Sequence, residues 1–327
     1  MRDAFKQFDQ ITNSEAFAAQ ALALFTYQYE NNTVYRSYCD LINTNPVEVK
    51  TIQEIPFLPI QFFKTHKIYS PDPPPVNYFE SSGTTGQIRS KHYVGDLQTY
   101  HQSFEKGFEL FYGPIEEYAL VALLPSYLER DNASLVYMAN ALIKKTKHPL
   151  SGFYLNEWEQ LKYTLDLLEQ KEQKTILLGV TFALLEVAEK YDWKLNHTLI
   201  METGGMKGMQ KEWVKSALHK YLGEHFGVSA IHAEYGMTEL LSQAYSKGNG
   251  LFYCPPWMKV LTRATEDPFE LIEYGKTGGV NIIDLANIDS CAFIATEDLG
   301  ILYPDGGFEI QGRFDQAEVR GCNLMVV

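Results

Sequence analysis

The feature that most constrains the fold of this chain is an alternation of short apolar runs with longer amphipathic ones between about residues 95 and 245. The apolar runs are YALVALL, TILLGV, HTLIMETGG and SAIHAEYG, and NASLVYMANALIKK, TFALLEVAEKY and KEWVKSALHKYLGEHFG lie between them. Such alternation is typical of strands followed by helices and predicts an α/β fold with a mainly parallel sheet covered by helices. Ligands of such sheets bind at the carboxyl ends of the strands. We therefore expect the chemistry at TGG, EYGMTE and the end of LLPSY.

The two ends of the chain differ from this central part. NSEAFAAQALALFTYQYENN places Ser14 before an apolar pattern at helical spacing, which predicts an N-capped helix over about residues 15–29. After residue 248, β-rich runs such as MKVLTRAT and CAFIATEDLGILY are separated by Gly, Pro and Asp turns. The expected division is an α/β core with an N-terminal helical lead-in over residues 1–247, and a smaller antiparallel β-rich subdomain over residues 248–327.

Charge limits the kinds of ligand. Across 327 residues, 28 Lys and Arg stand against 41 Asp and Glu, a net charge of -13. A chain of this charge repels polyanions, so broad binding to nucleic acid or anionic membrane is disfavoured. Any anionic ligand must be held locally. No apolar run approaches the roughly 20 residues that span a bilayer, and MRDAFKQFDQ lacks the apolar core of a signal peptide. We expect a cytoplasmic protein without stable membrane insertion.

The stretch YFESSGTTGQIRSKHY, residues 78–93, predicts a loop that binds phosphate. Its backbone amides and hydroxyls can converge on a phosphate, because glycines remove steric hindrance. It lacks the lysine of the GxxxxGK[ST] phosphate loop, and taken alone it is equally well explained as a surface turn. The candidate phosphate-binding residues are Ser81, Ser82, Gly83, Thr84, Thr85 and Gly86.

Three later segments supply the other parts of a nucleotide site. EYGMTEL offers an aromatic ring for a purine and a carboxylate for Mg²⁺. In TEDLG, Asp298 can accept hydrogen bonds from both ribose hydroxyls, and in QGRFD, Arg313 is a fixed cation for ribose or phosphate. The candidates in EYGMTEL are Glu234, Tyr235, Gly236, Thr238 and Glu239.

In this order the motifs resemble the adenylate-forming superfamily of acyl-CoA synthetases, phenylacetate-CoA ligases and firefly luciferase, with SSGTTG and YGMTE carrying most of the resemblance. The resemblance implies an enzyme that joins a carboxylic acid to ATP with Mg²⁺, giving acyl-AMP and pyrophosphate. It implies that Ser82, Thr84 and Thr85 hold the β and γ phosphates. It also implies that Tyr235 faces adenine, that Thr238 contacts the α phosphate and that Glu239 holds Mg²⁺. Asp298 would bind the ribose with assistance from Arg313, and Gly204 and Gly205 would lie close to the nucleotide and the acyl chain.

A narrower resemblance is to the LuxE-like acyl-protein synthetases. LPIQFFKTHKIYS, LLPSYLERDNASL and RGCNLMVV carry it. The chain ends fourteen residues after Arg313, so the mobile lid domain of larger relatives is expected to be absent. The resemblance implies transfer of the acyl group of a carboxylic acid, expected to be a fatty acid, from the adenylate to Cys322, and then to an acyl reductase or another acceptor protein. Arg320 would favour the thiolate. A small apolar residue in a terminal strand is the ordinary alternative for Cys322.

Two other functions stay open. A phenylacetate-CoA-ligase-like enzyme would pass the adenylate to CoA or another external acceptor, and its activity would survive loss of Cys322. A catalytically silent docking subunit of an acyl reductase complex would bind its partner without ATP turnover.

His92 and His232 are better explained as hydrogen-bonded structural histidines than as catalytic ones. Ser126 and Tyr127 are expected in the acyl pocket. Cys39, Cys254 and Cys291 form no CxxC pair with one another or with Cys322, so neither a zinc knuckle nor a redox motif is predicted.

Overall fold

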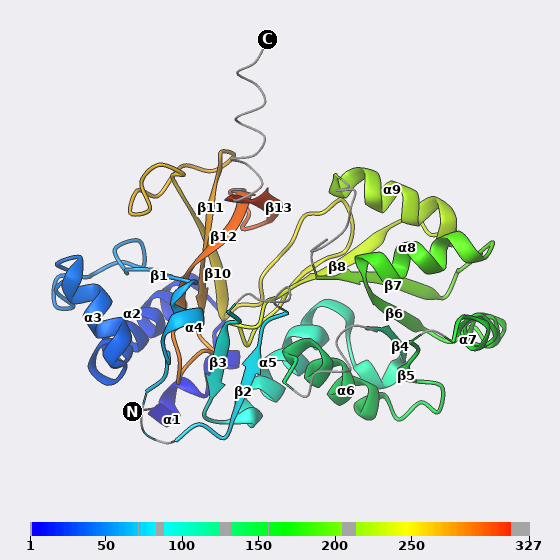
Figure 1. The fold of residues 1–327 in the computed structure, drawn as a ribbon, viewed down its shortest axis with the longest axis horizontal. Helices are drawn as coiled ribbons and strands as arrows, with labels where there is room; N and C mark the ends of the chain where they lie inside the picture. The colour runs from blue at the N-terminus through cyan, green and yellow to red at the C-terminus, as the bar shows by residue number, and fades with distance from the viewer. Residues whose placement is uncertain are drawn as a thin grey trace, which may run out of the picture.

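The computed structural model describes residues 2–70, 72, 74–82, 88–124, 132–155, 157–204 and 214–314. It contains two large sheets that lie side by side, with a short hairpin between them (Figure 1). Several predicted residues lie outside the described ones: Gly83, Thr84, Thr85, Gly86, Ser126, Tyr127, Gly205, Arg320 and Cys322.

The larger sheet has six strands in the order β5-β4-β6-β7-β8-β9. Its first five strands are parallel and β9 is antiparallel to β8, so the predicted mainly parallel sheet is confirmed. The inner strands β4 and β6 are buried along their whole length, which explains why they read as continuous apolar runs. The strands are β4 (Ala119–Leu123), β5 (Gly152–Phe153), β6 (Thr175–Val180), β7 (Thr198–Thr203), β8 (Ile231–Tyr235) and β9 (Ala244–Ser246).

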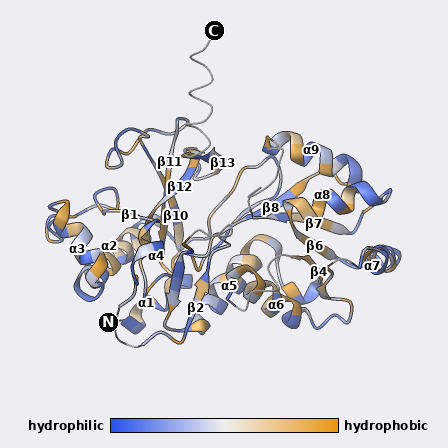
Figure 2. Ribbon diagram, in the orientation of Figure 1, coloured by the Kyte–Doolittle hydropathy of each residue, from blue (hydrophilic) through white to orange (hydrophobic). Residues whose placement is uncertain are grey.

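Helices cover both faces of this sheet. In Figure 1, α8 and α9 lie above it and α5 and α6 below it. Figure 2 shows α8 and α9 as mixtures of hydrophobic and hydrophilic residues, as expected for helices with one face against a sheet. None of the helices in the described part of the chain is long and apolar enough to cross a membrane. The helices are α5 (Leu97–Tyr112), α6 (Ser134–Thr146), α7 (Trp158–Gln170), α8 (Thr181–Lys190) and α9 (Lys215–Phe226), and the 3-10 helix η2 (Ile115–Glu117) precedes β4.

The second sheet has five strands, of which β10 to β13 pair antiparallel with one another in sequence order. This confirms that the late β-rich runs form an antiparallel sheet. A short strand from early in the chain, β1, joins it in parallel beside the first half of β12, and β13 pairs with the second half. The strands are β1 (Leu58–Pro59), β10 (Met258–Arg263), β11 (Thr277–Asp284), β12 (Phe293–Leu302) and β13 (Phe308–Arg313).

The N-terminal helices pack against this second sheet. Gln28 Nε2 donates to the carbonyl of Asn287 at 2.7 Å, and the ring of Tyr35 stacks on Phe293 with centroids 6.1 Å apart. The division at residue 247 stays a prediction, but these contacts connect the first helices with residues after it. The helical elements of this segment are α1 (Arg2–Phe5), η1 (Phe8–Gln10), α2 (Ser14–Asn31), α3 (Thr33–Leu41) and α4 (Phe62–Thr65).

The predicted capping residue of α2 is wrong by one position. The helix begins at Ser14, and the N-cap is Asn13, whose side-chain oxygen accepts from the Ala16 N–H at 2.8 Å. Asn13 has the extended backbone that an N-cap needs, and an Asn side chain satisfies a free N–H of the first turn as well as Ser does. At the other end, Asn32 closes α2 and caps α3 by accepting from the Tyr35 N–H at 3.1 Å.

The hairpin between the two sheets consists of β2 (Asn77–Glu80) and β3 (Lys91–Val94). Its strands pair antiparallel with Glu80 opposite Lys91. Just beyond this pair, the Ser81 N–H donates to the Ser90 carbonyl at 3.1 Å, and the Ser81 hydroxyl accepts from the Ser90 N–H at 3.0 Å. The predicted phosphate loop is therefore the connection of a closed hairpin, and Ser81 stabilises its base.

Candidate active site

Three predicted site residues from three different strands come together where the two sheets meet. Tyr235 is the last residue of β8, Asp298 lies in β12, and Arg313 ends β13. The Tyr235 hydroxyl donates to Asp298 Oδ2 at 2.7 Å, and Asp298 lies directly opposite Arg313 in the β12–β13 ladder. The carboxyl end of the parallel sheet therefore contacts the antiparallel sheet through residues that the sequence singled out.

The ring of Tyr235 is half-buried and backed by two phenylalanines. Its centroid is 5.6 Å from that of Phe308 and 5.9 Å from that of Phe252, and these two rings stack on each other at 5.5 Å. Burial, and then the negative charge of Asp298, raise the pKa of Tyr235 well above its usual range, so its hydroxyl stays protonated as a donor. A supported aromatic face of this kind fits the flat face of a purine.

Arg313 is held by the residue next to Asp298. Its guanidinium forms an ion pair with the carboxylate of Glu297, and Glu297 also accepts from Gln61 Nε2 at 2.8 Å. The backbone N–H of Asp298 donates to the Thr296 hydroxyl at 3.1 Å. Asp298 is therefore a half-buried carboxylate on a firmly held strand, which is what hydrogen bonding to two ribose hydroxyls requires.

His92 connects the phosphate-loop hairpin to the YGMTE segment. Its Nδ1 lies 2.8 Å from the carbonyl oxygen of Thr238, and its Nε2 lies 2.8 Å from Ser290 Oγ. Because a carbonyl only accepts, Nδ1 carries the proton and the Ser290 hydroxyl donates to Nε2. Burial lowers the pKa of His92 to about 4, so the ring is neutral near pH 7. The expected hydrogen-bonded structural histidine is confirmed, and its bond fixes the backbone of Thr238.

The segment after Thr238 is held by buried polar groups of β11 and the turn after it. The Glu239 carbonyl accepts from Asn287 Nδ2 at 2.8 Å. The N–H groups of Leu241 and Ser242 each donate to Asp284 Oδ2 at 2.9 Å. This network fixes the backbone on either side of the predicted magnesium ligand.

The donor set fits Mg²⁺ held chiefly by a nucleotide. The side chain of Glu239 is almost buried, with 4% exposed. Within the described ranges no group of three His, Cys, Asp or Glu side chains is arranged to hold a metal ion. Mg²⁺ that bridges phosphates needs only one or two protein carboxylates. One carboxylate, such as that of the predicted ligand Glu239, would therefore be enough for an ion of this kind.

Two buried carboxylates, Glu202 in β7 and Glu234 in β8, lie near the carboxyl ends of their strands, and the sequence did not predict their proximity. Glu234 faces Thr203 across the β7–β8 ladder and accepts its hydroxyl hydrogen bond. Glu202 accepts from Thr181 Oγ1 at 2.7 Å and lies 3.5 Å from the Lys215 ammonium. The signal that was available is the acidic residue directly before TGG at a strand end, where polar side chains of parallel sheets converge.

The two carboxylates differ in their ionisation. Burial, and more weakly the charge of Glu202, raise the pKa of Glu234 to about 7 against the opposing bond from Thr203. Burial also acts to raise the pKa of Glu202, but a hydrogen bond from His219 and the charge of Lys215 outweigh it, and the pKa is lowered. Glu202 is thus the ionised member, and Glu234 titrates near neutral pH.

Two glycines of the predicted site are required by their surroundings. Gly204 directly follows β7 and has a φ of +78°, in the left-handed region that glycine favours. At Gly236 a Cβ atom would lie 2.5 Å from Glu234 Oε1. Gly204 allows the chain to turn out of the sheet. Gly236, which has no side chain, leaves room for the buried carboxylate of Glu234 beside the backbone of the YGMTE motif.

The described cysteines are poor nucleophiles. Cys39 and Cys291 are buried and Cys254 is half-buried. Burial raises the pKa of Cys39 to about 12 and raises the pKa values of Cys254 and Cys291 well above the usual range. All three thiols are protonated near pH 7, so the expectation that they have no chemical role agrees with their environment.

The sequence was then compared with known families. The profile of the family described as "Acyl-protein synthetase, LuxE" matches residues 6–327. The chain belongs to this family. A long-chain-fatty-acid–luciferin-component ligase from Aliivibrio fischeri is 24% identical over 331 residues, covering 92% of this chain and 85% of the relative. A protein of the same name from Vibrio harveyi is 22% identical, covering 92% and 84%. The predicted LuxE resemblance and the acid-ligase class are confirmed.

Solved structures of similar fold are adenylate-forming ligases. A 2-hydroxyisobutyryl-CoA ligase in an open conformation with 2-HIB-AMP and CoA has a TM-score of 0.68 at 12% identity, covering 92% of this chain and 70% of that chain. ATP-bound MatB from Rhodopseudomonas palustris has a TM-score of 0.54 at 17% identity, covering 72% and 47%. These similarities confirm the predicted fold class for this LuxE-family chain.

Proposed function

We propose that this LuxE-family chain activates a fatty acid with ATP and passes the acyl group through its own Cys322 to a partner acyl reductase or another acceptor protein. The observation that carries the proposal is the contact of Tyr235 with Asp298, opposite Arg313, at the carboxyl end of the parallel sheet. The ligase names of the two bacterial relatives support a long-chain acid and a partner in the same system.

In the first step a carboxylate oxygen of the acid attacks the α phosphorus of ATP, and the bond to the β phosphate breaks to release pyrophosphate. Tyr235 provides the surface for adenine, and Asp298 accepts from the ribose hydroxyls. Thr238, whose backbone His92 holds, donates its hydroxyl to the α phosphate. Glu239 would hold Mg²⁺, which when bound would supply positive charge to offset the charge that develops on the phosphate oxygens.

The loop between Ser81 and Ser90 would hold the β and γ phosphates through Ser82 and its own amides and hydroxyls. Ser81 also closes the base of the hairpin through its hydroxyl, which accepts from the Ser90 N–H and keeps its own hydrogen available to donate. Gly204 and Gly205, after β7, would line the path of the acyl chain. Glu234 would lie below the nucleotide and affect its binding indirectly, through the backbone at Gly236.

In the second step the Cys322 thiolate attacks the acyl carbonyl carbon, a thioester forms, and AMP leaves with the electron pair of the cleaved mixed-anhydride bond. The thiol proton passes to solvent or to a nearby base. The three described cysteines are unsuited to this role because their thiols are held protonated. In this proposal residues 248–327 form the unit that completes the nucleotide site and carries the nucleophile.

The test is intact-protein mass spectrometry after incubation with MgATP and a panel of fatty and aromatic acids, comparing the native chain with Cys322→Ala. We expect a mass gain of one acyl group in the native chain and none in the variant, with Cys254→Ala as the matched control that still gains it. Pyrophosphate release without an acyl-enzyme would favour an external acceptor such as CoA. Partner binding without any pyrophosphate release would favour a silent docking subunit.

A further inference from the structure

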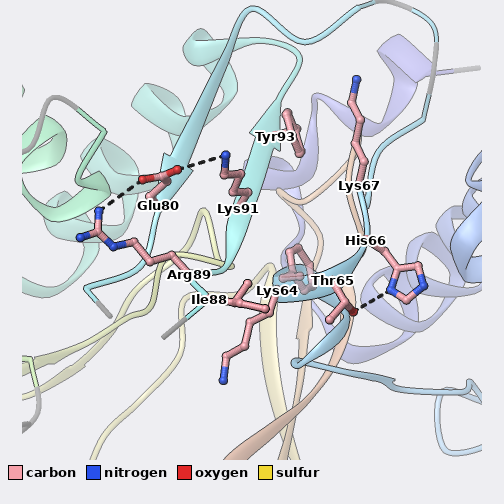
Figure 3. A pocket seen from close by; sticks show the side chains of 10 residues that line it. Lys64, Thr65, His66, Lys67, Glu80, Ile88, Arg89, Lys91 and Tyr93 are labelled. Carbon is pink, nitrogen blue, oxygen red and sulfur yellow. Dashed lines mark hydrogen bonds and ion pairs between the residues drawn. The ribbon is translucent and has the colours of Figure 1, made fainter. Parts of the chain in front are cut away.

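A positively charged cavity lies beside the base of the phosphate-loop hairpin. It has a volume of about 530 Å³ and lies between the segment that starts at α4 and the β2–β3 hairpin (Figure 3). One wall carries Lys64 and Lys67, and the facing wall carries Arg89 and Lys91 with Glu80 between them. Four cations and a single carboxylate therefore line one cavity, in a chain whose net charge is -13.

The two walls differ in how their charges are compensated. On the hairpin wall, Glu80 lies 3.6 Å from the Arg89 guanidinium and 3.3 Å from the Lys91 ammonium. On the α4 wall, the Lys67 ammonium lies 5.0 Å from the ring centroid of Tyr93. Over the residues that the structure describes, neither Lys64 nor Lys67 has a carboxylate within 4 Å. Both are exposed, so their charge is available to a ligand.

The cavity is connected to the candidate active site on both sides. Ile88 and Arg89, which line it, are two of the three residues that directly precede β3 on the side of the predicted phosphate loop. On the α4 side, Phe63 also lines it and packs edge-on against His92 at 5.8 Å, and His92 holds Thr238. Gln61, just before α4, holds Glu297 beside Asp298. A ligand here is therefore next to the place where the phosphates of a nucleotide are expected.

Charge explains why such a cavity is needed. The acid, ATP and pyrophosphate are all anions, and a chain of net charge -13 repels each of them at long range. A local excess of positive charge reverses this repulsion and raises the rate at which anions reach the site. Lysine ammonium groups and an arginine fork are the usual partners of phosphate oxygens.

We propose that this cavity is a second binding site for a phosphoanhydride chain, separate from the phosphate loop, which takes the triphosphate tail of arriving ATP or the departing pyrophosphate. The choice of pyrophosphate rests on the proposed function, because that reaction releases it. Glu80 competes with the ligand for Arg89 and Lys91. Removing its charge therefore strengthens binding, whereas reversing the charge of the α4 wall weakens it.

The first experiment is titration calorimetry of the full chain with inorganic pyrophosphate. We expect Lys64→Glu combined with Lys67→Glu to weaken binding by about tenfold or more, and Glu80→Gln to strengthen it by about threefold. The matched control is Lys171→Glu combined with Lys194→Glu. This pair makes the same change of net charge at exposed positions near the amino ends of β6 and β7, and its affinity should equal that of the native chain. Circular dichroism establishes that each variant is folded.

The second experiment separates the two sources of the phosphate chain. If the departing product uses the cavity, the Lys64→Glu and Lys67→Glu pair raises the inhibition constant of pyrophosphate and leaves KM for ATP unchanged. If the tail of ATP uses it, KM for ATP rises as well, and this rise shrinks at high ionic strength. Both results support the site.

Equal pyrophosphate affinity in the lysine pair and in its control would overturn the proposed cavity site, even if acyl-AMP forms normally. Calorimetry needs no turnover, so the proposed function can fail separately. A chain that makes no acyl-AMP with any acid, yet binds pyrophosphate through Lys64 and Lys67, would overturn the reaction and retain the site.

Discussion

The two carboxylates on either side of Tyr235 differ in burial, and we expect substitutions of them to have different effects. Glu234, the preceding residue, lies opposite Thr203 of β7, is 8% exposed and accepts a hydrogen bond from the Thr203 hydroxyl. Asp298, which accepts from the Tyr235 hydroxyl, is half-buried on the opposite side. Glu234, the inner carboxylate, belongs to the packing of the sheet, and Asp298, the outer one, faces the junction of the two sheets. Substitution of Glu234 should therefore alter the free energy of unfolding, and substitution of Asp298 should alter turnover with ATP.

The largest effect is expected from Asp298→Ala. Loss of two charge-assisted hydrogen bonds to ribose should remove about 3 to 5 kcal/mol of transition-state stabilisation, which lowers kcat/KM for ATP by a hundredfold to several thousandfold. The free energy of unfolding should change little. Pyrophosphate release at varied ATP concentration measures the first quantity and urea unfolding measures the second. Asp305→Ala, in the turn between β12 and β13, is the control, and an equal loss there would remove the special role of Asp298.

The next effect concerns pH and the inner carboxylate. The pKa of Glu234 is raised from 4.5 to about 7, so the folded state binds an additional proton between these values. The stabilising contribution is complete below about pH 4.5 and is lost as the pH rises to 7, by about 3 kcal/mol in all. Glu202, whose pKa is lowered, loses its contribution only below pH 4.5.

Glu234→Gln should remove this dependence. Urea unfolding at pH 5 and pH 8 should show the variant to be more stable than the native chain at pH 8, with a smaller difference between the two pH values. The exposed Glu266 provides the control variant Glu266→Gln, which should follow the native chain. A native chain equally stable at both pH values would contradict the assignment of the raised pKa.

His92→Ala should reduce the free energy of unfolding by about 2 to 3 kcal/mol, because it leaves the Thr238 carbonyl and the Ser290 hydroxyl without their partner in a buried place. Since Thr238 loses its support, kcat should fall as well. His92→Asn keeps a side-chain N–H near the position of Nδ1 and should recover part of both losses. Equal behaviour of the Ala and Asn variants in urea unfolding and turnover would show that the bond to Thr238 is unimportant.

The smallest effect is expected from Tyr235→Phe. The ring and its contacts with Phe252 and Phe308 remain, and only the hydroxyl that donates to Asp298 is lost. We expect the loss of about 1 kcal/mol of binding free energy, which raises KM for ATP roughly fivefold. Tyr253→Phe, which removes a comparable bond to the exposed Asp305, should leave KM unchanged. A loss as large as that of Asp298→Ala would mean that the hydroxyl itself contacts the nucleotide.

Much of the parallel sheet could be predicted because its signals are local. The strands β4, β6, β7 and β8 and the helices α8 and α9 all fall within the predicted runs, and α6 extends one residue beyond its run. The same is true of Tyr235, Asp298 and Arg313, each of which lies in a short motif whose order resembles a known superfamily. The cap of α2 was misplaced because Asn13 and Ser14 are both good capping residues and only the backbone conformation distinguishes them.

The sequence by itself determined the order of strands and helices, the prediction of a phosphate loop and membership of the LuxE family, because periodicity and motif spacing are properties of neighbouring residues. Only the tertiary structure decided that β1 joins β12, that His92 holds Thr238, and that Lys64 and Arg89 line one cavity. These pairs are separated by 25 to more than 200 residues of sequence. Their contacts follow from how the two sheets and the hairpin pack together, and no local pattern in the chain encodes that packing.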